Sequence, residues 1–403
     1  MEAATEAVRK PLPPGKFKSF LLERLRLRHY FEQPGDGRPQ AQIPARVLLW
    51  SFLIGTVLRR NSFHGLQALA RSPARQSLKI SRKFGKDTLG YFTERLGTAP
   101  LRQALVGVLR QAKRNKAFEQ SWWIGLILDG TGAARSSHRA CRYCHPIQGQ
   151  GEIRGYNHKF SLACLTAAGL VLPADVEPYR PGGGELAASR RMLERLVGSL
   201  GPRFAQYVVW DSLYANAPAL HQANDLGLYV AAPLKDNLPL LYTQARQRLE
   251  ALPPTGIFRE GTERVELWDA DDFDPWDRLR WPSVRVLRYR VHHPDGTLCQ
   301  GYWLTDIPTR KLSSKSLFRL CQGRWGIENQ GFNDGKNRYG LEHITHHHAN
   351  SLLVQWLLIC LALTCERLFR LRYLRRGTHP PMAAAELLLL LWIGLGRTPD
   401  DTS

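Results

Sequence analysis

An alternation of strand-like and helix-like segments between residues 119 and 233 most constrains the fold of this chain. The apolar run WIGLILDG (123–130) has the length and composition of a buried strand. Residues 158–178 hold two further apolar runs separated by a turn at Ala167–Gly169, which predicts a hairpin. The segments that follow are predicted to be an amphipathic helix, a strand, a helix and a strand, at 185–201, 206–211, 216–227 and 228–233.

This order of elements is that of a ribonuclease H-like fold, a three-layer α/β domain built around a mixed sheet. The segment 234–312 interrupts the order and is predicted to be a largely β insertion, with a hairpin at 284–306 that turns at Asp295–Gly296. The acidic run DADDFDPWD (269–277) is predicted to be a solvated loop. It is not an EF-hand, because Asp274 stands where that loop requires glycine.

Residues 1–118 are predicted to form an all-α basic domain in front of this α/β domain. They hold 23 Lys and Arg against 7 Asp and Glu, which is most of the net charge of +21. Such a concentration of positive charge favours a nucleic-acid partner. The alternative is a helical bundle that only packs on the rest of the chain. Helical periods separated by Gly, Ser and Pro, compatible with a helix-turn-helix-type arrangement, lie at 20–33, 45–60, 63–72 and 86–97.

The remaining composition favours a cytoplasmic protein that associates with the nucleoid. Seven cysteines, an odd number, do not predict a disulfide framework, and the N-terminus lacks an apolar signal region. The apolar stretches 352–365 and 383–396 are shorter than the roughly 20 residues of a membrane span. We therefore expect buried helices and no membrane partner. The expected domains are 1–118, a catalytic domain at 119–375 containing the insertion, and a tail with a short apolar helix at 376–403.

Three carboxylates follow segments of the type that two-metal chemistry requires. Asp129 closes the first apolar run, Asp211 closes the strand at 206–211, and Glu328 lies within a predicted helix at 313–329. Two divalent ions held between carboxylates can cleave a phosphodiester, and oxygen ligands of this kind suit Mg²⁺ or Mn²⁺. One Asp at a strand end carries little information. The three together, inside the predicted fold, are much more specific.

The residues around these carboxylates resemble the motifs of DDE transposases of bacterial insertion sequences. The similarity extends over about residues 120–370. It is to the group of these transposases whose β insertion lies between the second Asp and the catalytic Glu. The resemblance implies that Asp129, Asp211 and Glu328 are the catalytic and metal-binding residues. It implies phosphate contacts from Arg324, one turn before Glu328, and from Lys336. Lys336 follows Glu328 by eight residues, where seven is usual in the family. Cys321 stands where the family has a Tyr. The motifs are DGTG (129–132), WDSLYAN (210–216) and RWGIENQGFNDGKNRYGLEH (324–343).

The resemblance also implies an activity. The protein would bind terminal inverted repeats in double-stranded DNA, cleave the element ends as an endonuclease, and join the 3′-hydroxyl to target DNA, as a homodimer on DNA. Asn329, Arg135 and Arg139 are further candidates for DNA contacts. Two alternatives remain open from the sequence: a catalytically inactive DNA-binding regulator derived from a transposase, and a metal-dependent endonuclease without strand transfer.

Two clusters of metal-binding residue types stand apart from the carboxylates. Cys141 and Cys144 have the spacing of half a zinc site, with His138 and His145 nearby, but no clear second ligand pair appears in the sequence. A basic surface loop is therefore the preferred interpretation, and structural zinc is the alternative. The histidines of 343–348 are interpreted as a polar helix start rather than a metal cluster. Glu342 is a weaker rival of Glu328 for the third carboxylate.

Overall fold

A computed structural model of the chain describes residues 14–32, 35–121, 123–374 and 382–395. Parts of the predicted N-terminal domain and of the predicted tail therefore lie outside the described residues. The chain divides into two compact units. One is Phe118–Asp334, and the other combines Met1–Ala117 with Gly335–Ser403. The functional boundaries at residues 118 and 375 stay predictions.

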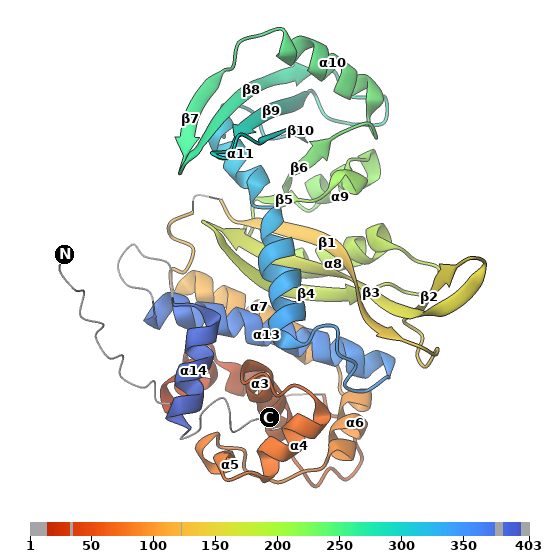
Figure 1. The fold of residues 1–403 in the computed structure, drawn as a ribbon, viewed down its shortest axis with the longest axis vertical. Coiled ribbons are helices and arrows are strands. Elements are labelled where there is room, and N and C mark those ends of the chain that lie inside the picture. The colour runs from red at the N-terminus through yellow and green to blue at the C-terminus, as the bar shows by residue number, and fades with distance from the viewer. Residues whose placement is uncertain (1–13, 33–34, 122, 375–381, 396–403) are drawn as a thin grey trace, which may run out of the picture. The chain divides into compact units, whose positions relative to one another are not determined.

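The unit Phe118–Asp334 is built on one mixed sheet (Figure 1). Its strand order is β2-β3-β1-β5-β6-β10-β9-β8-β7. β2 pairs with the first half of β3, and β4 pairs with the second half. The pairs β1·β5 and β5·β6 are parallel, whereas the other pairs are antiparallel. The strands are β1 Gly125–Ser136, β2 Cys144–Gly149, β3 Glu152–Ala167, β4 Leu170–Pro178, β5 Tyr207–Val209, β6 Tyr229–Leu234, β7 Gly256–Glu260, β8 Glu263–Phe273, β9 Val284–His292 and β10 Leu298–Thr305.

The insertion extends this sheet instead of forming a separate one, because β10 pairs with β6. It also contains a helix that the sequence did not predict, α10 Pro239–Glu250. The prediction of a solvated acidic loop at 269–277 was wrong for its first half, which lies in β8. Arg285 Nε donates to Asp269 Oδ1 at 2.8 Å, and Arg248 Nη1 lies 2.8 Å from Asp272 Oδ1. Arginines on neighbouring elements thus neutralise these aspartates and allow a strand.

Helices cover both faces of the central strands. On one face lies α8 Glu185–Leu200, which packs on β1, β3 and β4 with an apolar stripe that includes Met192 and Leu196. On the other face lies an irregular helical segment formed by α11 Ser314–Gln322 and the π-helix η3 Ile327–Asn333. The predicted helix at 216–227 is α9 Ala217–Asp225. Cys321 is fully buried in a core that includes Val209, Leu287 and Trp303.

The other unit is helical, as predicted for its N-terminal part. Its longest helix, α13 Ala349–Tyr373, is long and apolar enough to cross a membrane by length and composition, but it is buried inside the unit. Within it Glu366 pairs with Arg59 at 3.1 Å, and the buried Gln355 donates to the carbonyl of His343. A span facing lipid would leave such polar groups unsatisfied, so α13 is a core helix.

The N-terminal helices of this unit are short. The predicted single helix at 20–33 is broken at Arg26, whose φ of +58° no regular helix allows. The helices are α1 Pro14–Ser19, η1 Phe20–Arg24, α2 Leu27–Glu32, α3 Ala45–Val57, α4 Phe63–Arg71, α5 Ala74–Ser77, α6 Lys86–Arg95, α7 Ala99–Arg114, α12 Asp334–Tyr339 at the boundary between the units, and α14 Ala384–Gly394. The predicted class, a mixed-sheet α/β domain with a β-rich insertion after a helical N-terminal region, is confirmed.

Candidate active site

Strand register brings the first two predicted carboxylates together. β1 and β5 are parallel, and Ile127 pairs with Val209. Asp129 and Asp211 each follow these partners by two residues. Because side chains two residues apart point to the same face and paired strands lie about 4.8 Å apart, the two carboxylates are neighbours on one face. Asp211 also caps the following turn, with Oδ1 accepting from the Leu213 N–H at 2.7 Å.

Asp129 does not end its strand, contrary to the prediction. β1 continues to Ser136, because β3 is long enough to pair with it well beyond Asp129. β5 stops at Val209 and so leaves the edge of β1 next to Asp129 without a strand partner on that side. The two aspartates lie at this end of the short strand, beside the longer one.

Glu328 lies in a helix that packs on the same face of the sheet. A Cβ at Gly326 would lie 3.9 Å from Ile127 Cδ1 and 2.6 Å from Val171 Cγ2. A Cβ at Gly331 would lie 3.0 Å from Leu162 Cδ2, and Leu162 is the cross-strand partner of Asp129. The two glycines therefore let η3 approach the sheet, which places the Glu328 helix over Asp129.

Charged side chains around the site form an ion pair and shift the pKa of Asp129. Arg324 Nη2 lies 2.9 Å from Glu328 Oε1, one helical turn away. Burial raises the pKa of Asp129 to about 6, although the Gly130 N–H that donates to Oδ1 at 2.8 Å acts in the opposite direction. The charges of Glu185 and Asp211 raise the pKa of Asp129 further, whereas Arg324 lowers it. These three charges come from the start of α8, from the residue two positions after β5, and from the turn between α11 and η3.

Glu185 is an acidic group that the sequence analysis missed. It opens α8 behind Gly130, where a glycine leaves room for its carboxylate. Tyr214 donates to Oε1 at 3.0 Å and Tyr179 to Oε2 at 3.1 Å. The available signal was a carboxylate in the first turn of a predicted helix after the run PGGG. Helix position alone did not indicate that this turn meets the strand of Asp129.

Comparison with known proteins identifies the family. The profile of the family described as Transposase DDE domain matches residues 124–365, which is more than half of the chain. The chain belongs to the DDE transposase family. Among solved structures, the cryo-EM structure of the piggyBac transposase synaptic complex with hairpin DNA is similar at 12% identity, with a TM-score of 0.46, over 97% of this chain and 83% of that chain. No curated protein matches.

The matched DDE transposase domain contains all three predicted carboxylates, Asp129, Asp211 and Glu328. Their hard oxygen donors suit Mg²⁺ or Mn²⁺. The buried carboxyl of Asp129 lies within the field of two other acids, and Arg324 is already paired with Glu328. A divalent cation would relieve this repulsion. The residues present therefore fit the metal ions that DDE transposases generally use.

Three of the predicted DNA contacts are exposed on the unit Phe118–Asp334. Asn329 is exposed next to Glu328, and it lines a cavity of about 1100 Å³ together with Trp325 and Gln330. Arg135, at the end of β1, and Arg139, in the loop before β2, are exposed. All three side chains are therefore accessible to a ligand in solution.

Two residues of the family motif lie beyond the unit that holds the carboxylates. Lys336 belongs to the helical unit, and its amine lies 3.2 Å from Glu342 Oε1. Glu342, the rival third carboxylate, is exposed in this same ion pair. His346 Nε2 lies 2.7 Å from Glu94 Oε1, so this member of the histidine cluster has a carboxylate partner in its own unit.

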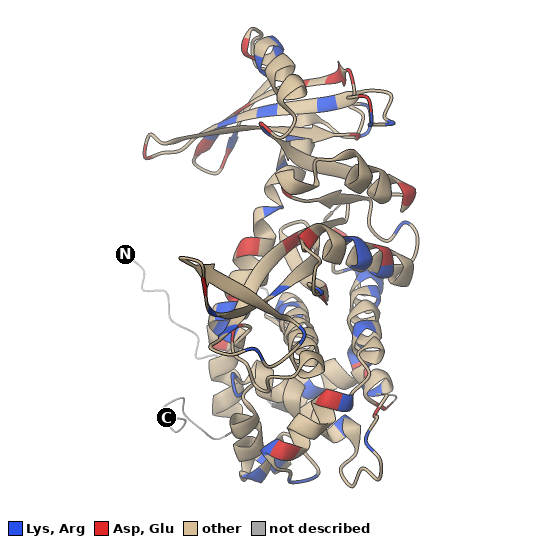
Figure 2. Ribbon diagram, turned by 90° about the vertical axis from the view of Figure 1, so that its right-hand side faces the viewer, with Lys and Arg blue, Asp and Glu red and all other residues tan. Residues whose placement is uncertain are grey.

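The helical unit contains a basic pocket, defined here by Lys18, Arg28, Arg46 and Lys79. These cations line a cavity of about 410 Å³ whose acidic lining residue is Glu32. Burial and the charges of Lys79 and Arg28 lower the pKa of Lys18. Lys and Arg lie on successive helices of this unit (Figure 2). Such crowded cations favour a polyanionic ligand.

Proposed function

We propose that this chain is a DNA transposase that binds the terminal inverted repeats of an element, cleaves its ends and joins the 3′-hydroxyl to target DNA. One observation carries the proposal: Asp129 in β1 and Asp211 just beyond β5 follow a pair of parallel strands, and the charge of Asp211 acts on Asp129 on the face that the helix of Glu328 covers. Membership of the DDE transposase family supports it. A homodimer on DNA is expected, because both element ends must be processed together.

In this proposal Asp129, Asp211 and Glu328 would hold two Mg²⁺ or Mn²⁺ ions. Ions bound there would supply positive charge that stabilises the oxygens of the reacting phosphodiester. Arg324 holds Glu328 through its ion pair and turns its planar guanidinium toward the phosphate when DNA binds. Glu185, fixed by Tyr179 and Tyr214, lies behind the strand, and its charge adds to burial in raising the pKa of Asp129.

DNA recognition is assigned to the basic N-terminal helices and their pocket. Arginine and lysine contacts to phosphates give binding that weakens steeply with salt. Asn329, Arg135, Arg139 and Lys336 are proposed as contacts near the cleaved strand. The same binding would keep the protein on chromosomal DNA in the cytoplasm.

The test uses the DNA that flanks the gene, searched for short inverted repeats. A labelled duplex carrying such an end is incubated with the full chain and Mn²⁺, with a plasmid as target. Cleavage at the end, followed by joining of the label to the plasmid, supports the proposal. Binding without cleavage would identify a regulator, and cleavage without joining would identify an endonuclease. Either of these two results would overturn the proposed strand transfer.

A further inference from the structure

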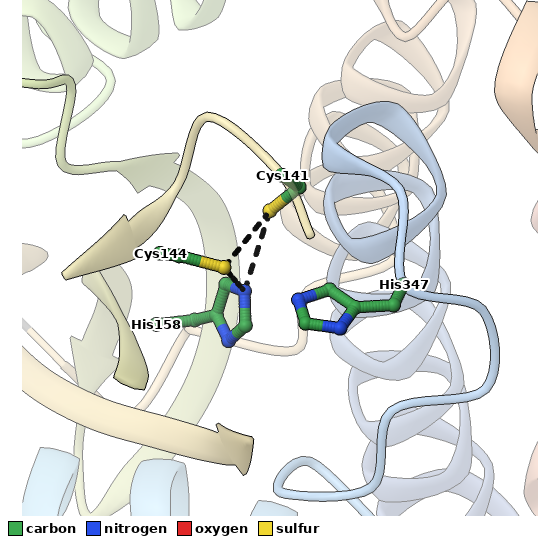
Figure 3. Close-up of side chains that lie close together, drawn as sticks. All are labelled: Cys141, Cys144, His158 and His347. Carbon is green, nitrogen blue, oxygen red and sulfur yellow. Dashed lines mark hydrogen bonds between the residues drawn. The ribbon is translucent and has the colours of Figure 1, made fainter. Parts of the chain in front are cut away.

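A second cluster of metal-binding residue types lies at the β2 edge of the sheet. Cys141 precedes β2, Cys144 begins β2, and His158 lies in β3 (Figure 3). In the register of the sheet, His158 is the partner of Cys144 on one side and of Ala133 on the other. His158 and Cys144 are buried, and Cys141 is half-buried. We propose that these three residues bind a structural zinc ion.

The spacing of the three ligand atoms matches one tetrahedral zinc ion. The two Sγ atoms lie 3.8 Å apart, and His158 Nε2 lies 3.3 Å from Cys141 Sγ and 3.4 Å from Cys144 Sγ. With Zn–S near 2.3 Å and Zn–N near 2.0–2.1 Å, a tetrahedron has S···S and S···N edges of about 3.8 and about 3.6 Å. A disulfide needs sulfurs about 2.05 Å apart. Two thiolates and an imidazole select zinc over magnesium.

The histidine is oriented as zinc ligands usually are. His158 Nδ1 lies 2.7 Å from the carbonyl oxygen of Ala134. A carbonyl only accepts, so Nδ1 carries the proton and Nε2 presents its lone pair to the two sulfurs. The backbone is bent for this contact: Ala134 has a φ of +53°, within the register shift of β1 between Ala133 and Ser136. A left-handed alanine is unfavourable by roughly 1–2 kcal/mol, so this geometry is consistent with a functional requirement.

The thiol pair also has the backbone contact expected of a metal loop. The Tyr143 N–H donates to Cys141 Sγ at 3.4 Å, which stabilises negative charge on that sulfur. Apart from the half-buried Cys141, the loop 137–142 holds exposed residues, among them Arg139 and Arg142. Zinc would tie this loop to β2 and β3 and so fix two arginines on the catalytic unit. The sequence analysis named only the cysteine pair, with zinc as the alternative, because the third ligand follows Cys144 by 14 residues and is brought back by strand pairing.

The fourth ligand is left to experiment. His138, in the loop that also carries Cys141, and a water molecule are the candidates within the same unit. Structural zinc sites are almost always four-coordinate, so one of these groups completes the site. The variant His138→Ala distinguishes them: zinc retention weakens if His138 is the fourth ligand and stays unchanged if water is.

The test measures zinc in the full chain, purified from zinc-supplemented medium and washed with a mild chelator. We expect one zinc ion per chain when the metal content is measured by elemental mass spectrometry. It is lost in Cys141→Ser and Cys144→Ser and kept in the control Cys299→Ser, a cysteine of β10 outside the cluster. Asp129→Asn keeps its zinc, so the result is independent of the proposed transposition.

A second measurement uses only the wild-type protein, so it decides the question even if the cysteine variants do not fold. Wild-type protein prepared with Co²⁺ in place of zinc should show thiolate-to-cobalt charge transfer and the intense d–d bands of tetrahedral coordination. Wild-type protein without bound zinc, or with cobalt bands that lack the thiolate contribution, would overturn the proposal. A Cys141–Cys144 disulfide in protein purified without oxidant would overturn it equally.

Discussion

The motif DGTG contains two glycines, and the structure predicts opposite outcomes for their substitution. A Cβ at Gly130 would lie 2.5 Å from Glu185 Cδ, and closer still to Tyr179 Oη and Glu185 Oε2. A Cβ at Gly132 would meet only Asn157 Nδ2, at 3.5 Å, an ordinary contact. Gly130→Ala should therefore be destabilising, and Gly132→Ala is its matched control in the same strand.

The loss of unfolding free energy in Gly130→Ala can be estimated from the side chains that the new methyl group would displace. Relief of the contact at Gly130 needs a shift of about 1 Å in Glu185, which lengthens its bonds from Tyr179 and Tyr214. Overpacking costs roughly 1–3 kcal/mol, and a hydrogen bond to a charged group contributes about 1.5–3 kcal/mol. These effects overlap, so we expect about 2 kcal/mol for Gly130→Ala and less than about 0.5 kcal/mol for Gly132→Ala.

The assay is thermal unfolding of the full chain with both variants in the same buffer. Units of 150–250 residues lose about 2–4 °C per kcal/mol, so the transition of the catalytic unit should fall by about 4–8 °C in Gly130→Ala. The midpoint of Gly132→Ala should stay near that of the wild type. Equal midpoints for the two variants would refute the packing of Glu185 behind Gly130.

Three further outcomes are expected. Asp211→Asn should reduce DNA cleavage to background and leave DNA binding in gel shifts intact; surviving cleavage would remove Asp211 from the site. Because the raised pKa of Asp129 favours its protonated form below about pH 6, protons compete with the metal there. Mn²⁺ affinity measured by calorimetry should fall about fivefold from pH 6 to pH 5, and a flat response between pH 7.5 and 5 would contradict this. Arg46→Ala with Lys79→Ala should weaken DNA binding and reduce the slope of log affinity against log salt by about 2; Arg190→Ala, an exposed arginine of α8, is the control, and an equal effect there would argue against the pocket.

Local patterns in the sequence sufficed for the order of elements and for the three carboxylates. Apolar runs of strand length gave β1, β3, β4, β5 and β6, and helical periodicity gave α8 and α9. A left-handed pair, Ala168 and Gly169, makes the predicted turn between β3 and β4. Such features depend on a residue and its near neighbours, which is why they can be read before any fold is known.

Tertiary structure decided which of these residues meet. Asp269 looked like part of a solvated loop, but Arg285 from the neighbouring strand turns it into a buried ion pair. Gly331 lies in the π-helix η3 and leaves the space in which this helix rests on Leu162. His158 gave no signal at all until the pairing of β3 with β2 placed it opposite Cys144. In each case the partner is remote along the chain, and strand register or helix packing selects it. The sequence alone determined the chemical groups and the elements that carry them, whereas long-range pairing determined their neighbours, and hence their charge, burial and reactivity.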